Sequence, residues 1–309
     1  MNGIKPNETQ PKSEEQAKSI KRPICHECSR PHKTCICSSL PEDRPLSLER
    51  CRIIVLQHPH EAKLKNRSLP ILELCLKQYK TEGMRSSKKW KRNGKEDVLE
   101  STSDWSMAVV VGRRLGQQID LSITDLLNQI ENVMLVFPFS YCDDKYQPVL
   151  SLEGGLAELN KRQSELASKN NKITIVFVDA TWKYAKEMVR VNDQLNLWPA
   201  RDLVRVKLDP PSEPTGADNS CLTSKAKTAH YTPPGYKPRR FAAVRTPPNC
   251  GENDETTSNF LSTAECIAWV ISYVENKTNL YDKLMKPLDQ IVGQWKHFQE
   301  LKAKRKVGC

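Results

Sequence analysis

Short apolar segments recur along the chain, and several of them run directly into a polar cluster. The clearest covers residues 173–178, ITIVFV, which shows no polar alternation and is rich in Ile and Val, as expected for a strand covered on both faces. It continues into Asp179, and the next residues, TWKYAKEMVRV, place Tyr184, Met188 and Val191 at helical spacing. Asp179 is therefore predicted at the carboxyl end of a buried strand, where ligands bind in open α/β sheets.

The same pattern predicts that strands and helices alternate along the chain. A capping box, STAE at 262–265, opens one helix, and Pro70 lies in the first turn of another. Further strands are expected over 52–57, 107–111, 133–139 and 203–208, and helices from about 66, over 155–168, from 182, from 262 and from about 282. This alternation predicts an α/β fold with a mainly parallel sheet. Neither a GxGxxG motif after a strand nor a GxxxxGK[ST] phosphate loop is present.

Composition changes at both ends of the chain and once inside it. Residues 1–21 are polar and predicted to be disordered; because they lack the apolar core of a signal peptide, we expect the cell interior, in the cytoplasm, the nucleus or both. Residues 209–240 are rich in Pro and poor in apolar residues, which favours a long surface excursion. The expected divisions are 1–21, a cysteine-rich segment at 22–45, a main domain at 46–280 that contains this insertion, and a basic helical tail at 281–309.

Four cysteines fall close together in two pairs, Cys25 with Cys28 and Cys35 with Cys37. Each pair is able to occupy one edge of a tetrahedron, so the spacing favours a structural zinc site. The alternatives are free thiols or a redox pair, and a nearby histidine could replace one cysteine as a ligand. Structural disulfides are not expected in the cell interior.

The overall charge of the chain indicates which kind of molecule it binds. With 48 Lys and Arg against 37 Asp and Glu, the formal net charge is +11. An excess of this size favours a polyanion, and no stretch is apolar over the length that a transmembrane helix needs, so nucleic acid is preferred to a membrane. The alternative is a basic surface that is merely solvated.

A basic segment with one aromatic residue is the first candidate for contact with nucleic acid. Within SSKKWKRNGK, a base could stack on the tryptophan while the flanking cations meet phosphates. The candidate RNA-binding residues are Lys88, Lys89, Trp90, Lys91 and Arg92. A solvated loop is the alternative.

Several motifs at predicted strand ends occur in a specific order. The paired cysteines, LQHPHE, FPFS, DATW, AAVRTPP and LSTAE together resemble the DTW-domain family of tRNA-uridine aminocarboxypropyltransferases, over residues 22–275. The resemblance implies a SPOUT-like α/β fold, related to knotted RNA methyltransferases, with S-adenosylmethionine as co-substrate and tRNA as partner. It also implies transfer of the 3-amino-3-carboxypropyl group to N3 of a tRNA uridine, with release of methylthioadenosine.

The chemistry of this transfer assigns roles to the residues at the strand ends. Uridine N3 carries a proton at neutral pH, so the reaction needs a proton acceptor, for which Asp179 is the candidate. The candidate catalytic residues are Asp179, Thr181 and Trp182. A helix cap at Asp179 or Thr181, and simple packing of Trp182, are the structural alternatives. The candidate residues for binding the co-substrate are His58, Arg113, Pro138, Arg245, Ser262, Thr263 and Glu265. Among these, Arg245, Arg113 or the helix N-terminus at 262–263 is expected to hold the carboxylate of the transferred arm.

Two other functions remain open from the sequence. A SPOUT-type RNA methyltransferase would release S-adenosylhomocysteine in place of methylthioadenosine. A zinc-containing RNA-binding protein without catalysis would account for the charge and the cysteines but would leave Asp179 only a structural role. The target tRNA, the uridine position and the oligomeric state cannot be read from the chain.

Overall fold

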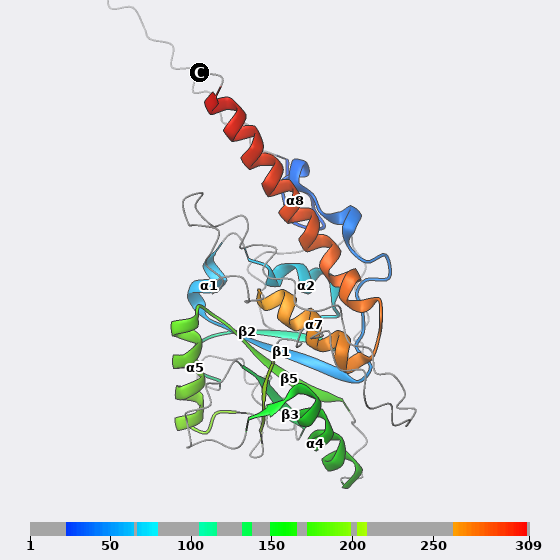
Figure 1. Cartoon of the computed structure of the whole chain (residues 1–309), viewed down its shortest axis with the longest axis vertical. Helices are drawn as coiled ribbons and strands as arrows, with labels where there is room; N and C mark the ends of the chain where they lie inside the picture. The colour runs from blue at the N-terminus through cyan, green and yellow to red at the C-terminus, as the bar shows by residue number, and fades with distance from the viewer. Residues whose placement is uncertain are drawn as a thin grey trace, which may run out of the picture.

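The computed structural model describes residues 23–64, 67–79, 105–115, 132–137, 149–165, 172–198, 203–208 and 262–307 (Figure 1). Several predictions fall outside these residues, namely the disordered segment 1–21, the insertion 209–240, the loop that carries Lys88 to Arg92, Pro138, and Arg245. They remain predictions. Among the described residues, no helix combines the length and the hydrophobicity that a membrane span requires.

The centre of the molecule is a six-stranded sheet in which every pairing is parallel. The strand order is β2-β1-β5-β3-β6-β4. Their bounds are β1 Cys51–Gln57, β2 Met107–Val111, β3 Val133–Val136, β4 Leu150–Ser151, β5 Ile173–Asp179 and β6 Val204–Lys207. The parallel sheet confirms the expected α/β class, and the SPOUT-like topology stays a prediction.

Helices cover both faces of the sheet. Their bounds are α1 Pro59–Lys63, α2 Leu69–Cys75, α4 Leu152–Glu165, α5 Trp182–Gln194, α7 Thr263–Glu275 and α8 Leu280–Val307, and two 3-10 turns, η1 His32–Thr34 and η2 Cys37–Ser39, precede the sheet. Alternate side chains of the central strands divide the core into two parts. One part packs against α2, α4, α7 and α8, and the other packs against α5, as the placement of α5 in Figure 1 reflects.

The start of one helix, the end of one strand and the presence of two short elements differ from the sequence prediction. The helix expected at 155–168 begins at Leu152, so Gly154 and Gly155 lie inside it. A Cβ on Gly155 would overlap the side chain of Val206, so this glycine permits close packing of α4 on the sheet. Strand β3 ends at Val136, three residues before the expected end. Helix α1 and the two-residue β4 were not predicted, since both are too short to show a hydrophobic period.

The parallel register brings the strand ends that matter for function to one edge. Gln57 at the end of β1 pairs with Val111 of β2 on one side and with Asp179 of β5 on the other. Helix α7 begins near the same edge, since its first residue, Thr263, hydrogen-bonds to Asp179. Residues that are far apart in sequence therefore meet where the strands end.

Candidate functional site

Asp179 is the last residue of β5 and is half-buried. Its Oδ2 accepts a hydrogen bond from Gln57 Nε2 at 2.7 Å, and its Oδ1 accepts one from the Thr263 hydroxyl at 2.6 Å. Thr181 occupies the N-cap position of α5 but its side chain makes no cap hydrogen bond. Within the described part of the chain, the Asp179 carboxylate therefore joins the sheet to α7 and does not cap α5.

Two more charged residues, Arg67 and Glu73, belong to the same group. We call the five residues Asp179, Gln57, Thr263, Arg67 and Glu73 the acid cluster. Gln57 is 1% exposed, and its Oε1 accepts from Arg67 Nη1 at 3.2 Å while its Nε2 donates to the carboxylate. The arginine thus fixes which way the glutamine amide points. Burial raises the pKa of Glu73, the charge of Asp179 raises it further, and the charge of Arg67 lowers it.

The first turn of α7 is ordered by its own side chains. The Ser262 hydroxyl accepts from the backbone N–H of Glu265 at 3.3 Å, and Glu265 Oε2 accepts from the backbone N–H of Ser262 at 2.9 Å. The predicted capping box is confirmed. It holds the first turn of the helix and the Thr263 hydroxyl in place beside the Asp179 carboxylate.

His58 lies at the end of β1 but belongs to a second group on the α5 side of the sheet. It is 1% exposed, and its ring stacks on Tyr184 with centroids 4.4 Å apart and planes 6° apart. Its Nδ1 accepts from the backbone N–H of His60 at 3.1 Å, so Nε2 carries the proton of the neutral ring, and within the described residues Nε2 has no hydrogen-bond partner. Burial lowers the pKa of His58, and the charge of Arg113 lowers it further. The neutral ring is therefore a donor at neutral pH.

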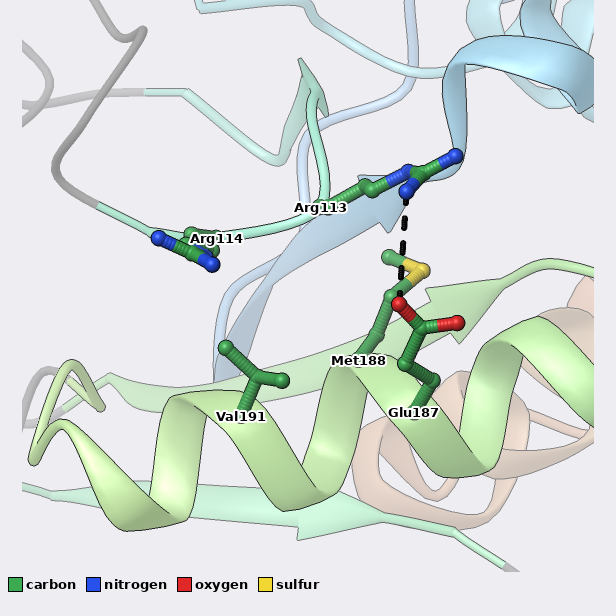
Figure 2. Close-up of a pocket in the computed structure, with 5 residues that line it drawn as sticks. All are labelled: Arg113, Arg114, Glu187, Met188 and Val191. Carbon is green, nitrogen blue, oxygen red and sulfur yellow. Dashed lines mark ion pairs between the residues drawn. The ribbon is translucent and has the colours of Figure 1, made fainter.

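Arg113 follows β2 and faces α5 across a small pocket. Figure 2 shows its guanidinium directed toward Glu187, 4.0 Å away, with Arg114, Met188 and Val191 completing the lining. The guanidinium also lies 6.0 Å from the centroid of the Tyr184 ring. Arg113 is thus placed with the His58 group and not with the acid cluster.

Trp182 opens α5 three residues after Asp179 and keeps 49% of its surface exposed. Its ring lies parallel to Phe137, which follows β3, with centroids 5.7 Å apart. The Lys186 ammonium lies 4.6 Å from the centroid of the same indole. An exposed aromatic ring with a cation beside it is able to receive a nucleobase and its phosphate.

The structure therefore separates the predicted site residues into groups. Asp179 lies with Thr263, His58 lies with Arg113, and Ser262 and Glu265 cap their own helix. Sequence reasoning missed Gln57, Arg67, Glu73 and Tyr184. Gln57 gave a signal, since it is the polar residue that ends an apolar run in the LQHPHE motif. Tyr184 was expected on the apolar face of its helix, and Arg67 and Glu73 are charged residues beside and in a short helix, which gives no sign of a site.

The four paired cysteines form the second candidate site. The Sγ atoms of Cys25, Cys28, Cys35 and Cys37 all lie within 4.8 Å of one another, which allows them to hold one metal ion. Backbone N–H groups lower the pKa of Cys25 to about 6, whereas burial raises the pKa of Cys28 and of Cys37. Thiols of raised pKa need a nearby cation to become thiolates, and a bound metal ion supplies that charge.

The cysteine segment is fastened to α8. The Cys35 carbonyl accepts from Gln290 Nε2 at 3.1 Å and from Gln294 Nε2 at 3.4 Å. Figure 1 shows the amino-terminal segment beside α8, whose carboxyl-terminal part extends away from the sheet. The metal candidate thus lies on a different element from the acid cluster and is suited to holding structure.

Comparison with known protein families gives one match over most of the chain. A family model described as "DTW domain" matches residues 22–296. No solved structure matches the chain.

Curated relatives carry a shared type of name. "tRNA-uridine aminocarboxypropyltransferase 2" of Macaca fascicularis is 22% identical over 271 residues, which cover 88% of this chain and 63% of the relative, and the protein of that name from Mus musculus gives the same values. "tRNA-uridine aminocarboxypropyltransferase A" of Arabidopsis thaliana is 25% identical over 180 residues, 58% of this chain and 55% of the relative. The chain spans less than two thirds of the length of these relatives.

Proposed function

The chain belongs to the DTW-domain family, and from this premise we propose that it is a tRNA-uridine aminocarboxypropyltransferase. The donor is S-adenosylmethionine, and the acceptor is N3 of a uridine in tRNA. The names of the curated relatives support the reaction class, and the basic excess of the chain supports a polyanionic substrate. The observation that carries the proposal is the Asp179 carboxylate, held between Gln57 and Thr263 at the carboxyl edge of a parallel sheet.

The transfer is a displacement at carbon. The lone pair of uridine N3 forms a bond to the γ-carbon of the amino-acid arm, and the bond from that carbon to sulfur breaks, with its electron pair leaving on sulfur as the neutral thioether of methylthioadenosine. The proton on N3 must go to a base. A carboxylate has about four lone-pair positions, so two remain on Asp179 after its bonds to Gln57 and Thr263. We assign Asp179 as the proton acceptor.

The choice between the arm and the methyl group is a matter of orientation. Both carbons are bonded to the same sulfonium, so the enzyme must aim the arm at N3. Trp182, three residues beyond the acid and exposed, is the proposed platform for the uracil ring, with Lys186 beside it for a neighbouring phosphate. On the α5 side of the sheet, His58 offers the co-substrate a buried N–H donor.

The cysteine cluster takes no part in the transfer. We propose that it holds one structural Zn²⁺, because four thiols at this spacing suit the tetrahedral ion and because the segment docks on α8, through Cys35. The ion would supply folding free energy to a short segment that buries only a few side chains, among them Ile36 and Leu40.

Product analysis tests the proposal. Purified protein, S-adenosylmethionine and unmodified tRNA are incubated, and the tRNA nucleosides and the released small molecules are identified by mass spectrometry. Aminocarboxypropyluridine together with an equal amount of methylthioadenosine is the expected result. A methylated nucleoside with S-adenosylhomocysteine would instead identify a methyltransferase, and bound tRNA with neither product would indicate an RNA-binding protein without catalysis.

A further inference from the structure

Arg67 lies just before α2 and makes few of its possible hydrogen bonds with the residues that the structure describes. Of the five N–H donors on its guanidinium, Nη1 supplies the bond to Gln57 Oε1 at 3.2 Å, which is its one hydrogen bond within the described residues. The side chain is half-buried, and it belongs to the acid cluster on the α7 side of the sheet. A guanidinium with a free fork in such a position matches a planar carboxylate.

Glu73 places an opposite charge in the same cluster. It lies on α2, is half-buried, and makes no hydrogen bond with any described residue. Its helix, α2, packs with α7 in the same part of the core, and the charges of both Arg67 and Asp179 act on its pKa. A half-buried carboxylate without a donor is unfavourable, and a bound cation would relieve that cost.

The opposite charges of Arg67 and Glu73 match the two charges at the amino-acid end of S-adenosylmethionine. The α-carbon of S-adenosylmethionine carries a carboxylate and an ammonium, which need a guanidinium and a carboxylate at neighbouring positions. Gln57 bonds to Arg67 through Oε1 at 3.2 Å and to Asp179 through Nε2 at 2.7 Å, so one amide group and the two hydrogen bonds at its ends separate the anchoring arginine from the acid. An arm held at Arg67 thus has its transferable γ-carbon close to the proton acceptor.

We propose that Arg67 and Glu73 bind the zwitterionic amino-acid end of the co-substrate, Arg67 the carboxylate and Glu73 the ammonium. This inference rests on the proposed function and names the residues that select the arm. Arg113 is less suited to the task, because it lies 4.0 Å from Glu187 and belongs to the His58 group on the opposite face. Gln57 is a positioning residue that sets the distance between the anchored arm and Asp179.

Two ligands that differ only in the arm provide the test. S-adenosylhomocysteine carries the whole aminocarboxypropyl arm, whereas methylthioadenosine lacks it, so calorimetric binding of both reports on the arm without any turnover. Arg67→Gln is expected to weaken S-adenosylhomocysteine about 10- to 100-fold, as for the loss of a charge-assisted bidentate contact, and to leave methylthioadenosine unchanged. Glu73→Gln should weaken the same ligand alone. Arg162→Gln, which removes an arginine paired with Glu158 on the surface of α4, is the matched control and should change neither affinity.

The outcomes separate this inference from the function on which it rests. Wild-type protein that binds neither ligand would contradict both. Wild-type protein that binds S-adenosylhomocysteine, with the Arg67→Gln affinities for both ligands either unchanged or lowered equally, would overturn the arm-binding role alone, since an equal loss marks a structural defect. Arg67→Lys keeps the charge without the fork, and it should lose an intermediate amount of affinity for S-adenosylhomocysteine.

Discussion

Glu73 combines a charge, partial burial and the absence of any hydrogen-bond partner among the described residues. Such a group is poorly suited to stability, and its pKa is raised by burial and by the charge of Asp179. If its role is to hold an ammonium, the free protein carries a destabilising charge that the co-substrate neutralises. Function and stability should then respond in opposite directions when the charge is removed.

We expect Glu73→Gln to raise the melting temperature at neutral pH. A carboxyl whose pKa is higher in the folded state loses stability as the pH rises from its unfolded pKa through its folded pKa, so the wild-type penalty grows as the carboxyl ionises and is smallest in acid. The gain should be on the order of 1 to 4 °C, the usual shift for about 1 kcal/mol or less in a domain of this size. Calorimetric melting at pH 7 and at pH 4 measures it; a gain of equal size at both pH values would show that the charge is not the cause.

At the level of single residues, Asp179 could be predicted but its partners could not. The apolar run before it gives its strand and its edge. Gln57 and Thr263 lie 122 and 84 positions away in the sequence, and only the strand register and the placement of α7 bring them to its carboxylate. No sequence pattern singles out Arg67 or Glu73, because a charged residue in or beside a short helix is most often solvated.

Among the elements, the cysteine segment and α8 depend on each other. Gln290 and Gln294 bond to the Cys35 carbonyl, and among the described residues Lys283 on the same helix pairs with Asp43 at 2.9 Å. The Lys283 pair is exposed, but the two glutamine bonds are part-buried, and Ile36 and Leu40 of the segment pack in the core. The metal ion is expected to add to this order by joining the four cysteines.

Removal of the metal should loosen this pair of elements and spare the sheet. We expect one zinc per chain in protein purified without chelator, reduced by Cys35→Ser and retained by Cys266→Ser, whose thiol lies on α7 outside the cluster. After chelation, hydrogen exchange should speed up in residues 23–45 and on the facing turns of α8. Elemental analysis that finds no zinc in the wild-type protein would contradict the structural role.

Elements with a strong hydrophobic period were predictable, and those set by packing were not. Strands β1, β2, β5 and β6 and helices α5, α7 and α8 follow the predicted positions closely, because each buries a continuous apolar face. The start of helix α4 was predicted too late, since glycines are unusual inside a helix and the close contact of Gly155 with Val206 cannot be seen in a local pattern. The capping box of α7 was readable because all of its hydrogen bonds are local.

At the scale of the whole molecule, the net charge of +11 predicts how the substrate is held. Contact with phosphates releases counterions, so tRNA affinity should fall steeply as salt rises. The segment from Lys88 to Arg92, with Trp90 inside it, is the predicted contact. Because this affinity is independent of the co-substrate, it should be separable from the chemistry.

Replacing Lys88, Lys89, Lys91 and Arg92 together by Gln should weaken tRNA binding and flatten its salt dependence. If all four meet phosphates, the slope of log affinity against log salt should fall by about 3 to 4, since each contact contributes about 0.7 to 0.9. Filter binding over a series of salt concentrations gives both quantities, and methylthioadenosine binding should not change. Equal affinity and equal slope in the variant would make the segment ordinary solvated surface.

If Asp179 takes the proton of uridine N3, replacing it by Asn should slow a single turnover of the enzyme. Asn is able to keep both neighbours, because its oxygen accepts from Gln57 and its amide donates to the Thr263 hydroxyl. Thr263→Val is the control, since it breaks one of these bonds and leaves the acid. With methylthioadenosine release as the measurement, we predict that Asp179→Asn loses about two to four orders of magnitude in rate, with co-substrate binding retained, and that Thr263→Val loses far less. A folded Asp179→Asn protein that modifies tRNA at near the wild-type rate would contradict the account and leave Asp179 a link between the sheet and α7.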